Sequence, residues 1–187
     1  MNVDQLLDAL RFGEDKELEF KSARGGVPRS LWETYSSFAN TDGGVIVLGV
    51  KQHSGNRFEI QGLENAEKIR QDFWNNVNNP AHVSCNLLRN DDVRVHRVDD
   101  RGAFKDVLIV EVPRADRHQR PVFLAPNPLT GTYRRYHEGD YKCEKNEVRR
   151  MLSDADQNSA DSRVLPCFSM DDIHIESLQQ YLSLIHI

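Results

Sequence analysis

A polar turn that runs directly into an apolar segment constrains the fold of this chain more than any other feature. Residues 38–50 read FANTDGGVIVLGV, so an Asn-Thr-Asp-Gly-Gly turn precedes the apolar residues Val45 to Leu48. An apolar run without polar alternation is typical of a strand that is buried on both faces or covered by a helix. Gly43 and Gly44 carry no Cβ, so the chain can turn tightly into this strand. The segment therefore predicts a buried strand with polar and charged groups at the edge of a well-packed sheet.

The segments around this strand predict a mixture of helices and strands. Apolar residues at helical spacing predict helices over residues 3–10, 28–39, 65–78, 145–154 and 173–182. Strands are predicted over residues 18–22, 45–50, 57–61, 83–89, 93–98, 103–112, 132–137 and 140–143. Because helices interrupt a mostly antiparallel set of strands, we predict an α+β fold, with helices packed on a mixed, mostly antiparallel sheet.

The length and composition suit one domain followed by a short appendage. A polar linker at residues 157–162 places the boundary near residue 155 of the 187 residues. The chain shows neither a run of about 18 apolar residues nor a signal-peptide pattern, so we expect a soluble, cytoplasmic protein without a membrane partner. Cys85, Cys143 and Cys167 form no CxxC pair, which argues against structural zinc and a disulfide framework.

The charge is distributed unevenly along the chain. The formal net charge is −5, yet residues 101–150 hold 11 basic and 7 acidic residues, whereas residues 151–187 hold 1 and 6. The acidity therefore belongs to the tail, and the second half of the domain is basic enough to face phosphates. The strands predicted after Pro80 also leave open the pairing of sheet edges in a homo-oligomer.

Two basic segments, residues 114–120 and residues 133–142, are candidates for a nucleic-acid contact. Residues 133–142 interleave cations with Tyr133, Tyr136 and Tyr141, a pattern in which cations meet phosphates and aromatic rings stack on bases. Strand alternation predicts Arg134 and Tyr136 on one face and Arg135 on the other. A solvated charged surface is the alternative interpretation. The residues expected to contact nucleic acid are Lys21, Arg114, Arg117, Arg120, Arg134, Arg135 and Lys142.

The Asn40-Thr41-Asp42-Gly43-Gly44 turn is not a phosphate-binding loop of the Walker type. No Gly-Lys-Ser or Gly-Lys-Thr follows it, and the strand comes after the glycines rather than before them. The preceding helix also presents its C-terminus, the negative end of its dipole, to the turn. The pattern favours a structural turn at a helix C-terminus, formed by Asn40, Thr41, Gly43 and Gly44.

Several of these segments together resemble the Schlafen AlbA-type DNA-binding domain. The carrying residues are Glu14, Glu19-Phe20-Lys21, residues 38–50, Gly62-Leu63, Pro121-Val122 and residues 133–152. In bacteria this domain often stands at the N-terminus of transcriptional regulators and helicase-like proteins. The resemblance implies that residues 1–155 form a nucleic-acid-binding domain of such a regulator, with DNA as the expected ligand and no cofactor. Residues 156–187 would then be a linker and the start of a following region.

The same resemblance implies two alternative functions. Vertebrate Schlafens include metal-dependent ribonucleases, whose acidic residues are similar to Glu14 and Glu19 here. These carboxylates would hold Mg²⁺ or Mn²⁺, but Lys51-Gln52 stands where the family commonly has a third acidic residue. The competing interpretation pairs Glu19 with Lys21 to organise the strand. An ATP-binding, helicase-like protein is the third alternative, and no motif supports it.

The last six residues have a resemblance of their own. Residues 182–187, LSLIHI, are similar to the translation of an adapter used in sequencing libraries. The polar pattern of residues 171–180 also stops abruptly before them. We therefore expect the natural protein to continue past about Tyr181, in a C-terminal region of the same protein that is missing here.

Overall fold

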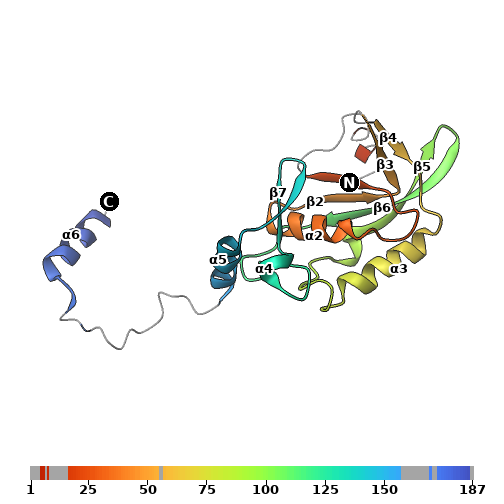
Figure 1. The fold of residues 1–187 in the computed structure, drawn as a ribbon. Helices are drawn as coiled ribbons and strands as arrows, with labels where there is room; N and C mark the ends of the chain where they lie inside the picture. The colour runs from red at the N-terminus through yellow and green to blue at the C-terminus, as the bar shows by residue number, and fades with distance from the viewer. Residues whose placement is uncertain are drawn as a thin grey trace. The chain divides into compact units, whose positions relative to one another are not determined.

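The chain divides into two compact units, residues 1–155 and residues 156–187. The computed structural model describes residues 5, 6, 8, 17–54, 57–156, 169 and 172–185. The first unit holds every strand of the described residues (Figure 1). In the second unit the described helix is α6 (Ile175–Ile185). The predicted helix over residues 3–10 lies largely outside the described residues, although Leu6 is described and is buried.

A four-stranded sheet forms the centre of the first unit. Its order is β1 (Leu18–Lys21), β2 (Gly44–Leu48), β6 (Ala103–Val112) and β5 (Val93–Asp100). β1 runs parallel to β2, and the other pairs are antiparallel. Two antiparallel pairs complete the strands, β3 (Val50–His53) with β4 (Arg57–Ile60) and β7 (Tyr133–Tyr136) with β8 (Gly139–Lys142). The predicted α+β class, with a mixed and mostly antiparallel sheet, is confirmed.

The buried strand predicted after the glycine turn is β2. Ile46, Val47 and Leu48 are completely buried, because β2 lies between β1 and β6 and both of its faces are covered. The strand ends at Leu48 rather than at Val50. Gly49 has a φ of +101°, a backbone conformation that breaks the ladder and redirects the chain into β3.

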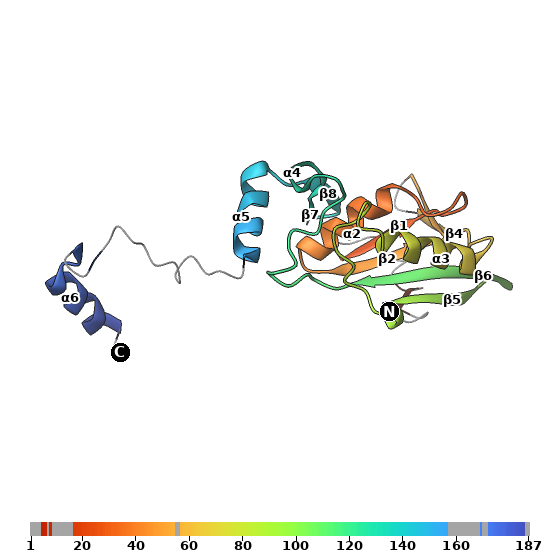
Figure 2. The ribbon, with the colours of Figure 1, turned by 90° about the horizontal axis from the view of Figure 1, so that it is seen from below.

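Two apolar clusters pack on the two faces of the sheet. Ile46, Leu48 and Leu108 face α2 (Ser30–Asn40) and α3 (Ala66–Val77), whose Trp32 and Phe73 rings stack 5.4 Å apart. The alternate residues, among them Val47 and Ile109, form the second cluster with residues of β1, β3, β4 and β5. This division follows from the two-residue period of a strand. Figure 2 shows the two helices beside the sheet.

A buried asparagine helps to join α2 to the later part of the unit. Asn40 is completely buried, and its amide donates to the carbonyl oxygens of Val122 (2.7 Å) and Tyr133 (3.0 Å). Its Oδ1 accepts from the Val122 backbone N–H at 2.8 Å. These bonds satisfy backbone groups that burial would otherwise leave unpaired. They fix the end of α2 against the β7–β8 hairpin, which α4 (Pro128–Gly131) precedes and α5 (Lys145–Ala155) follows.

The turn after α2 is a tight helix C-terminus. The Phe38 carbonyl accepts from the N–H groups of Thr41 (3.1 Å) and Gly43 (2.9 Å). Gly43 has a φ of +84°, and a Cβ there would lie 2.8 Å from the Val112 carbonyl oxygen. A Cβ on Gly44 would lie 2.8 Å from the Phe38 ring. Both glycines are therefore required by close approach of the turn to the chain around it.

One sequence expectation about secondary structure is wrong. Residues 83–89 form no strand, apart from an isolated bridge between Val83 and Leu124. Side chains satisfy the backbone of this segment instead: the Tyr35 hydroxyl accepts from Leu87 N–H (2.9 Å) and donates to the Cys85 carbonyl (3.2 Å). None of the helices in the described residues could span a membrane.

Candidate nucleic-acid interface

The strand β7 sends its side chains to two different environments. Tyr133 and Arg135 are buried, whereas Arg134 is half-buried and Tyr136 is exposed. This is the alternation that the sequence predicts for a strand with one face against the protein. The adjacent arginines of the YRRY sequence therefore lie on opposite faces, and they have different partners.

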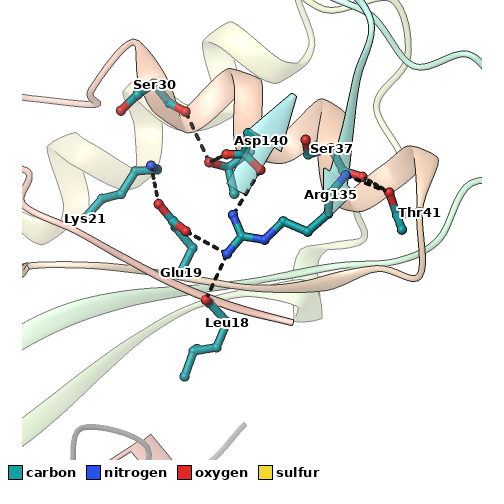
Figure 3. A network of polar contacts seen from close by, with 9 residues as sticks. Leu18, Glu19, Lys21, Ser30, Ser37, Thr41, Arg135 and Asp140 are labelled. Atoms are coloured by element: carbon teal, nitrogen blue, oxygen red, sulfur yellow. Dashed lines mark hydrogen bonds and ion pairs between the residues drawn. The ribbon is translucent and has the colours of Figure 1, made fainter. Parts of the chain in front are cut away.

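On the inner face, Arg135 forms a buried ion-pair network (Figure 3). Its guanidinium donates to Glu19 Oε2 at 2.9 Å and to Asp140 Oδ1 at 3.0 Å, and the side chain is only 3% exposed. The same guanidinium lies 5.0 Å from the centre of the Phe38 ring. Arg135, a residue of β7, thus connects β1 to β8 on the inner face of the hairpin.

The network continues on both carboxylates. Glu19 Oε1 pairs with Lys21 Nζ at 2.7 Å, and Asp140 Oδ2 accepts from the Thr34 hydroxyl at 2.6 Å. Among the described residues, two cations thus face two carboxylates. Burial lowers the pKa of Arg135, but hydrogen bonds and charge from Asp140 and Glu19 raise that pKa by more, so its net direction is upward. Arg135 stays charged, and withdrawing it would leave Asp140 without a cationic partner among the described residues.

This placement removes two of the expected contact residues from the candidate interface. Arg135 is enclosed by its partners and is not presented to a polyanion. Lys21 is held by Glu19, and its side chain is 12% exposed. The pairing of Glu19 with Lys21 agrees with the structural interpretation of these residues, in which the pair organises β1.

Of the two carboxylates in the divalent-metal site that the resemblance implies, Glu19 is described, and it is paired with cations. Both oxygens of Glu19 face cations, and Asp42, a potential substitute ligand, lies 3.7 Å from Arg114. Within the part of the chain that the structure describes, no group of three or more His, Cys, Asp or Glu side chains is placed to hold a metal ion. Glu14 lies outside the described residues, so the nuclease alternative, which needs Glu14 and Glu19, stays a prediction.

On the outer face, arginines gather around a single pocket of about 280 Å³, which we call the arginine pocket. Arg134 reaches it from β7, while two further arginines come from the loop after β6 and one from α5. Arginines outnumber carboxylates four to two in its wall. The lining residues are Arg117, Arg120, Arg134, Glu147, Arg150, Met151 and Asp154.

Local structure explains why residues distant in sequence meet here. The Asp116 carbonyl accepts from the N–H groups of Gln119 (3.0 Å) and Arg120 (3.1 Å), which curls the loop and brings Arg117 and Arg120 to one side. On α5, the lining residues follow one another at intervals of three, one and three, the spacing of a single helix face. Arg150 belongs to that face together with Glu147.

The pocket keeps a surplus of positive charge. Arg134 pairs with Glu147, whose hydrogen bond raises the pKa of Arg134 further. Arg117 donates from Nε to His118 Nε2 at 3.1 Å. Among the described ion pairs, none involves Arg117, Arg120 or Arg150. Three guanidinium groups are thus available to an anion that enters the pocket.

The remaining predicted cations lie elsewhere on the unit. Arg114 faces Asp42 at the α2–β2 turn, and Lys142 lies 5.8 Å from the centre of the Tyr133 ring. Neither residue lines the arginine pocket. Arg150 was missed by the sequence analysis, which considered α5 only for its apolar side chains. Its position three residues after Glu147 in a basic helix was the available signal.

Comparisons with known proteins identify the family. The family model described as "Schlafen, AlbA_2" matches residues 14–144. A solved structure, the N-terminal domain of a protein from Nitrosomonas europaea that carries the name of a RecG-related ATP-dependent DNA helicase, aligns with a TM-score of 0.54 and 28% identity. The alignment covers 76% of this chain and 94% of that one. No protein with a curated function matches the chain significantly. The chain therefore belongs to the Schlafen AlbA_2 family, as its sequence motifs had indicated.

Proposed function

We propose that residues 1–155 form a nucleic-acid-binding module that grips backbone phosphates in the arginine pocket. The observation that carries the proposal is the convergence of Arg117, Arg120 and Arg134, from two separate basic segments, with Arg150 around one concavity. Guanidinium groups present forked N–H donors that match the oxygens of a phosphate. A phosphate would also relieve the mutual repulsion of these cations.

DNA is the expected ligand, and a bacterial transcriptional regulator is the expected context. The name of the Nitrosomonas europaea protein refers to a DNA helicase, and its N-terminal domain is the part that aligns with this chain. The half of the domain that supplies the pocket is also the basic half, with 11 basic and 7 acidic residues between positions 101 and 150. Backbone phosphates supply most of the affinity of such contacts and no sequence information.

The test is a salt titration of binding by matched variants of the full chain. Fluorescence anisotropy with labelled single-stranded DNA, duplex DNA and tRNA is recorded between about 50 and about 200 mM salt. The variant Arg120→Gln plus Arg150→Gln removes two pocket cations. Its control, Arg70→Gln plus Arg149→Gln, changes the net charge equally at exposed arginines that do not line the pocket. We expect the pocket variant to lower the salt-dependence slope by about two and the control to leave it unchanged.

Two results would contradict the proposal. Equal losses in the pocket variant and its control would mean that only net charge matters. Cleavage of the probes with Mn²⁺ but not with EDTA, abolished by Glu14→Gln, would instead support the metal-dependent nuclease. Glu19→Gln is not used for this comparison, because a change at Glu19 would also disturb the Arg135 network.

A further inference from the structure

The outer face of the β7–β8 hairpin displays two tyrosines next to the arginine pocket. Tyr136 is 54% exposed and Tyr141 is 57% exposed, and the centres of their rings lie 6.2 Å apart. Two exposed rings that lie side by side offer a larger continuous aromatic surface than a single exposed ring does. The pair forms a small aromatic surface beside a cationic one.

The strand register explains this arrangement. Arg134 lies opposite Tyr141, and Tyr136 lies opposite Gly139, so the three side chains share one face of the hairpin. Gly139 has no side chain, and a Cβ there would lie 2.5 Å from the Tyr141 ring. The glycine thus leaves room for that ring to lie beside Tyr136.

Arg134 connects the aromatic surface to the pocket. Its guanidinium carbon lies 6.0 Å from the centre of the Tyr136 ring, and the same side chain lines the arginine pocket. A polymer held by its phosphates in the pocket would therefore pass close to the two rings. The hairpin itself does not need these rings for packing, because Tyr133, Arg135 and Asp140 on the inner face make its contacts with β1 and α2.

We propose that Tyr136 and Tyr141 are a stacking platform for unpaired bases, so that the module takes single-stranded nucleic acid. This inference rests on the proposed function, since the phosphates must lie in the arginine pocket. An aromatic ring can stack only on a base whose face is exposed, and bases inside a duplex already stack on one another. Stacking is tolerant of sequence, so the platform selects strandedness rather than a base.

The test compares oligonucleotides of about 20 nucleotides as single-stranded DNA, single-stranded RNA, duplex DNA and an abasic strand with the same phosphates. The full chain carries Tyr136→Leu plus Tyr141→Leu, which retains apolar bulk and removes the aromatic faces. The control is Phe104→Leu, because Phe104 is also an exposed aromatic (65%) with an arginine near its ring: Arg97, at 5.3 Å. Far-UV circular dichroism verifies that each variant is folded.

We expect the wild type to prefer single strands over the duplex and over the abasic strand. The tyrosine variant should lose about 5- to 150-fold in affinity for a single strand per base that it no longer stacks. Its salt slope should not change, since no phosphate contact is removed. The Phe104 control should bind as the wild type does, and RNA and DNA single strands should respond alike.

The outcomes separate this inference from the proposed function. Binding that depends on the pocket arginines but is equal for single strands and duplex overturns the platform alone. Unchanged single-strand affinity in the tyrosine variant overturns it as well, as does an equal loss in the Phe104 control. If neither single strands nor duplex bind in a salt-dependent way, the proposed function itself is wrong.

Discussion

Replacing Arg135 by methionine tests whether this arginine is structural, as its burial indicates, or contacts nucleic acid, as its sequence context suggests. Methionine retains most of the aliphatic stem and removes the guanidinium. The change deletes the hydrogen-bonded pairs to Glu19 and Asp140, at 2.9 and 3.0 Å. It also deletes the contact between the guanidinium and the Phe38 ring.

The expected loss of stability follows from what each carboxylate keeps. Among the described residues, Glu19 keeps Lys21 as a cationic partner, whereas Asp140 keeps the Thr34 hydroxyl and no cation. Breaking a buried ion pair by removing one partner costs about 3–5 kcal/mol. Because only one of the two carboxylates is left without a cation, we expect Arg135→Met to lower the free energy of unfolding by about 3 kcal/mol. That is a large share of the ~5–15 kcal/mol typical of a domain.

Urea denaturation of the full chain, followed by far-UV circular dichroism, measures this loss. Lys21→Met is the matched control, because it removes the other cation and leaves each carboxylate a partner, so its cost should be smaller than that of Arg135→Met. Adding Asp140→Asn to Arg135→Met should recover part of the loss, because the neutral amide needs no cation. An Arg135→Met variant as stable as the wild type would refute the structural role of the network.

Two further predictions concern other contacts of the same unit. Gly44→Ala should lower the free energy of unfolding by about 1–3 kcal/mol, because its Cβ would lie 2.8 Å from the Phe38 ring. Gly25→Ala is the control in the same urea assay. It should be nearly neutral, because a Cβ at Gly25 would have no atom within 4 Å. Burial, with help from the nearby Glu147 carboxylate, raises the pKa of the Cys143 thiol to about 12, so this thiol should react only slowly with a disulfide reagent near pH 8 in the folded protein. Because the unfolded thiol ionises from about pH 9, the free energy of unfolding should fall as the pH rises from about 9 towards 12. The fall should be smaller in Cys143→Ser, which lacks the thiol. An equal fall in the wild type and the variant would contradict the raised pKa.

The sequence predicted those parts of the fold that depend on local pattern. The apolar runs of β2 and β6, the helical spacing of α2 and α3, and the alternation along β7 follow from periods of two and 3.6 residues. The failed prediction at residues 83–89 has a long-range cause. The Tyr35 hydroxyl, from α2, takes the hydrogen bonds that a neighbouring strand would have supplied.

The candidate site was harder to predict than the fold, because its partners are far apart in sequence. Arg135 pairs with Glu19 across 116 positions, and nothing local to YRRY distinguishes that arginine from Arg134 except strand parity. Parity gives opposite faces but does not say which face is buried. Arg150 lines the arginine pocket because it lies on the same face of α5 as Glu147, which a count of charges cannot show. Family motifs were enough to indicate the domain, whereas tertiary contacts were needed to distinguish its buried cations from those that line the pocket.

The inner network and the outer surface are connected through the two strands of the hairpin. Arg135 on β7 and Asp140 on β8 fix the hairpin to Glu19 of β1 and Thr34 of α2. This holds Arg134 and the two tyrosines on the opposite face in one orientation, which spares the ordering cost when a ligand binds.

Arg135 should therefore affect nucleic-acid binding without touching it. Arg135→Met should weaken binding because the hairpin is less well held, yet its salt slope should equal that of the wild type, since no phosphate contact is lost. Arg134→Met, one residue away, should lower the slope by about one. Removing Arg134 also frees the Glu147 carboxylate, which then repels the phosphate, so the affinity should fall by more than the loss of one phosphate contact. Equal salt-dependence slopes for the two variants would mean that the adjacent arginines act alike. The assignment of a structural role to the inner face of β7 and a binding role to its outer face would then be wrong.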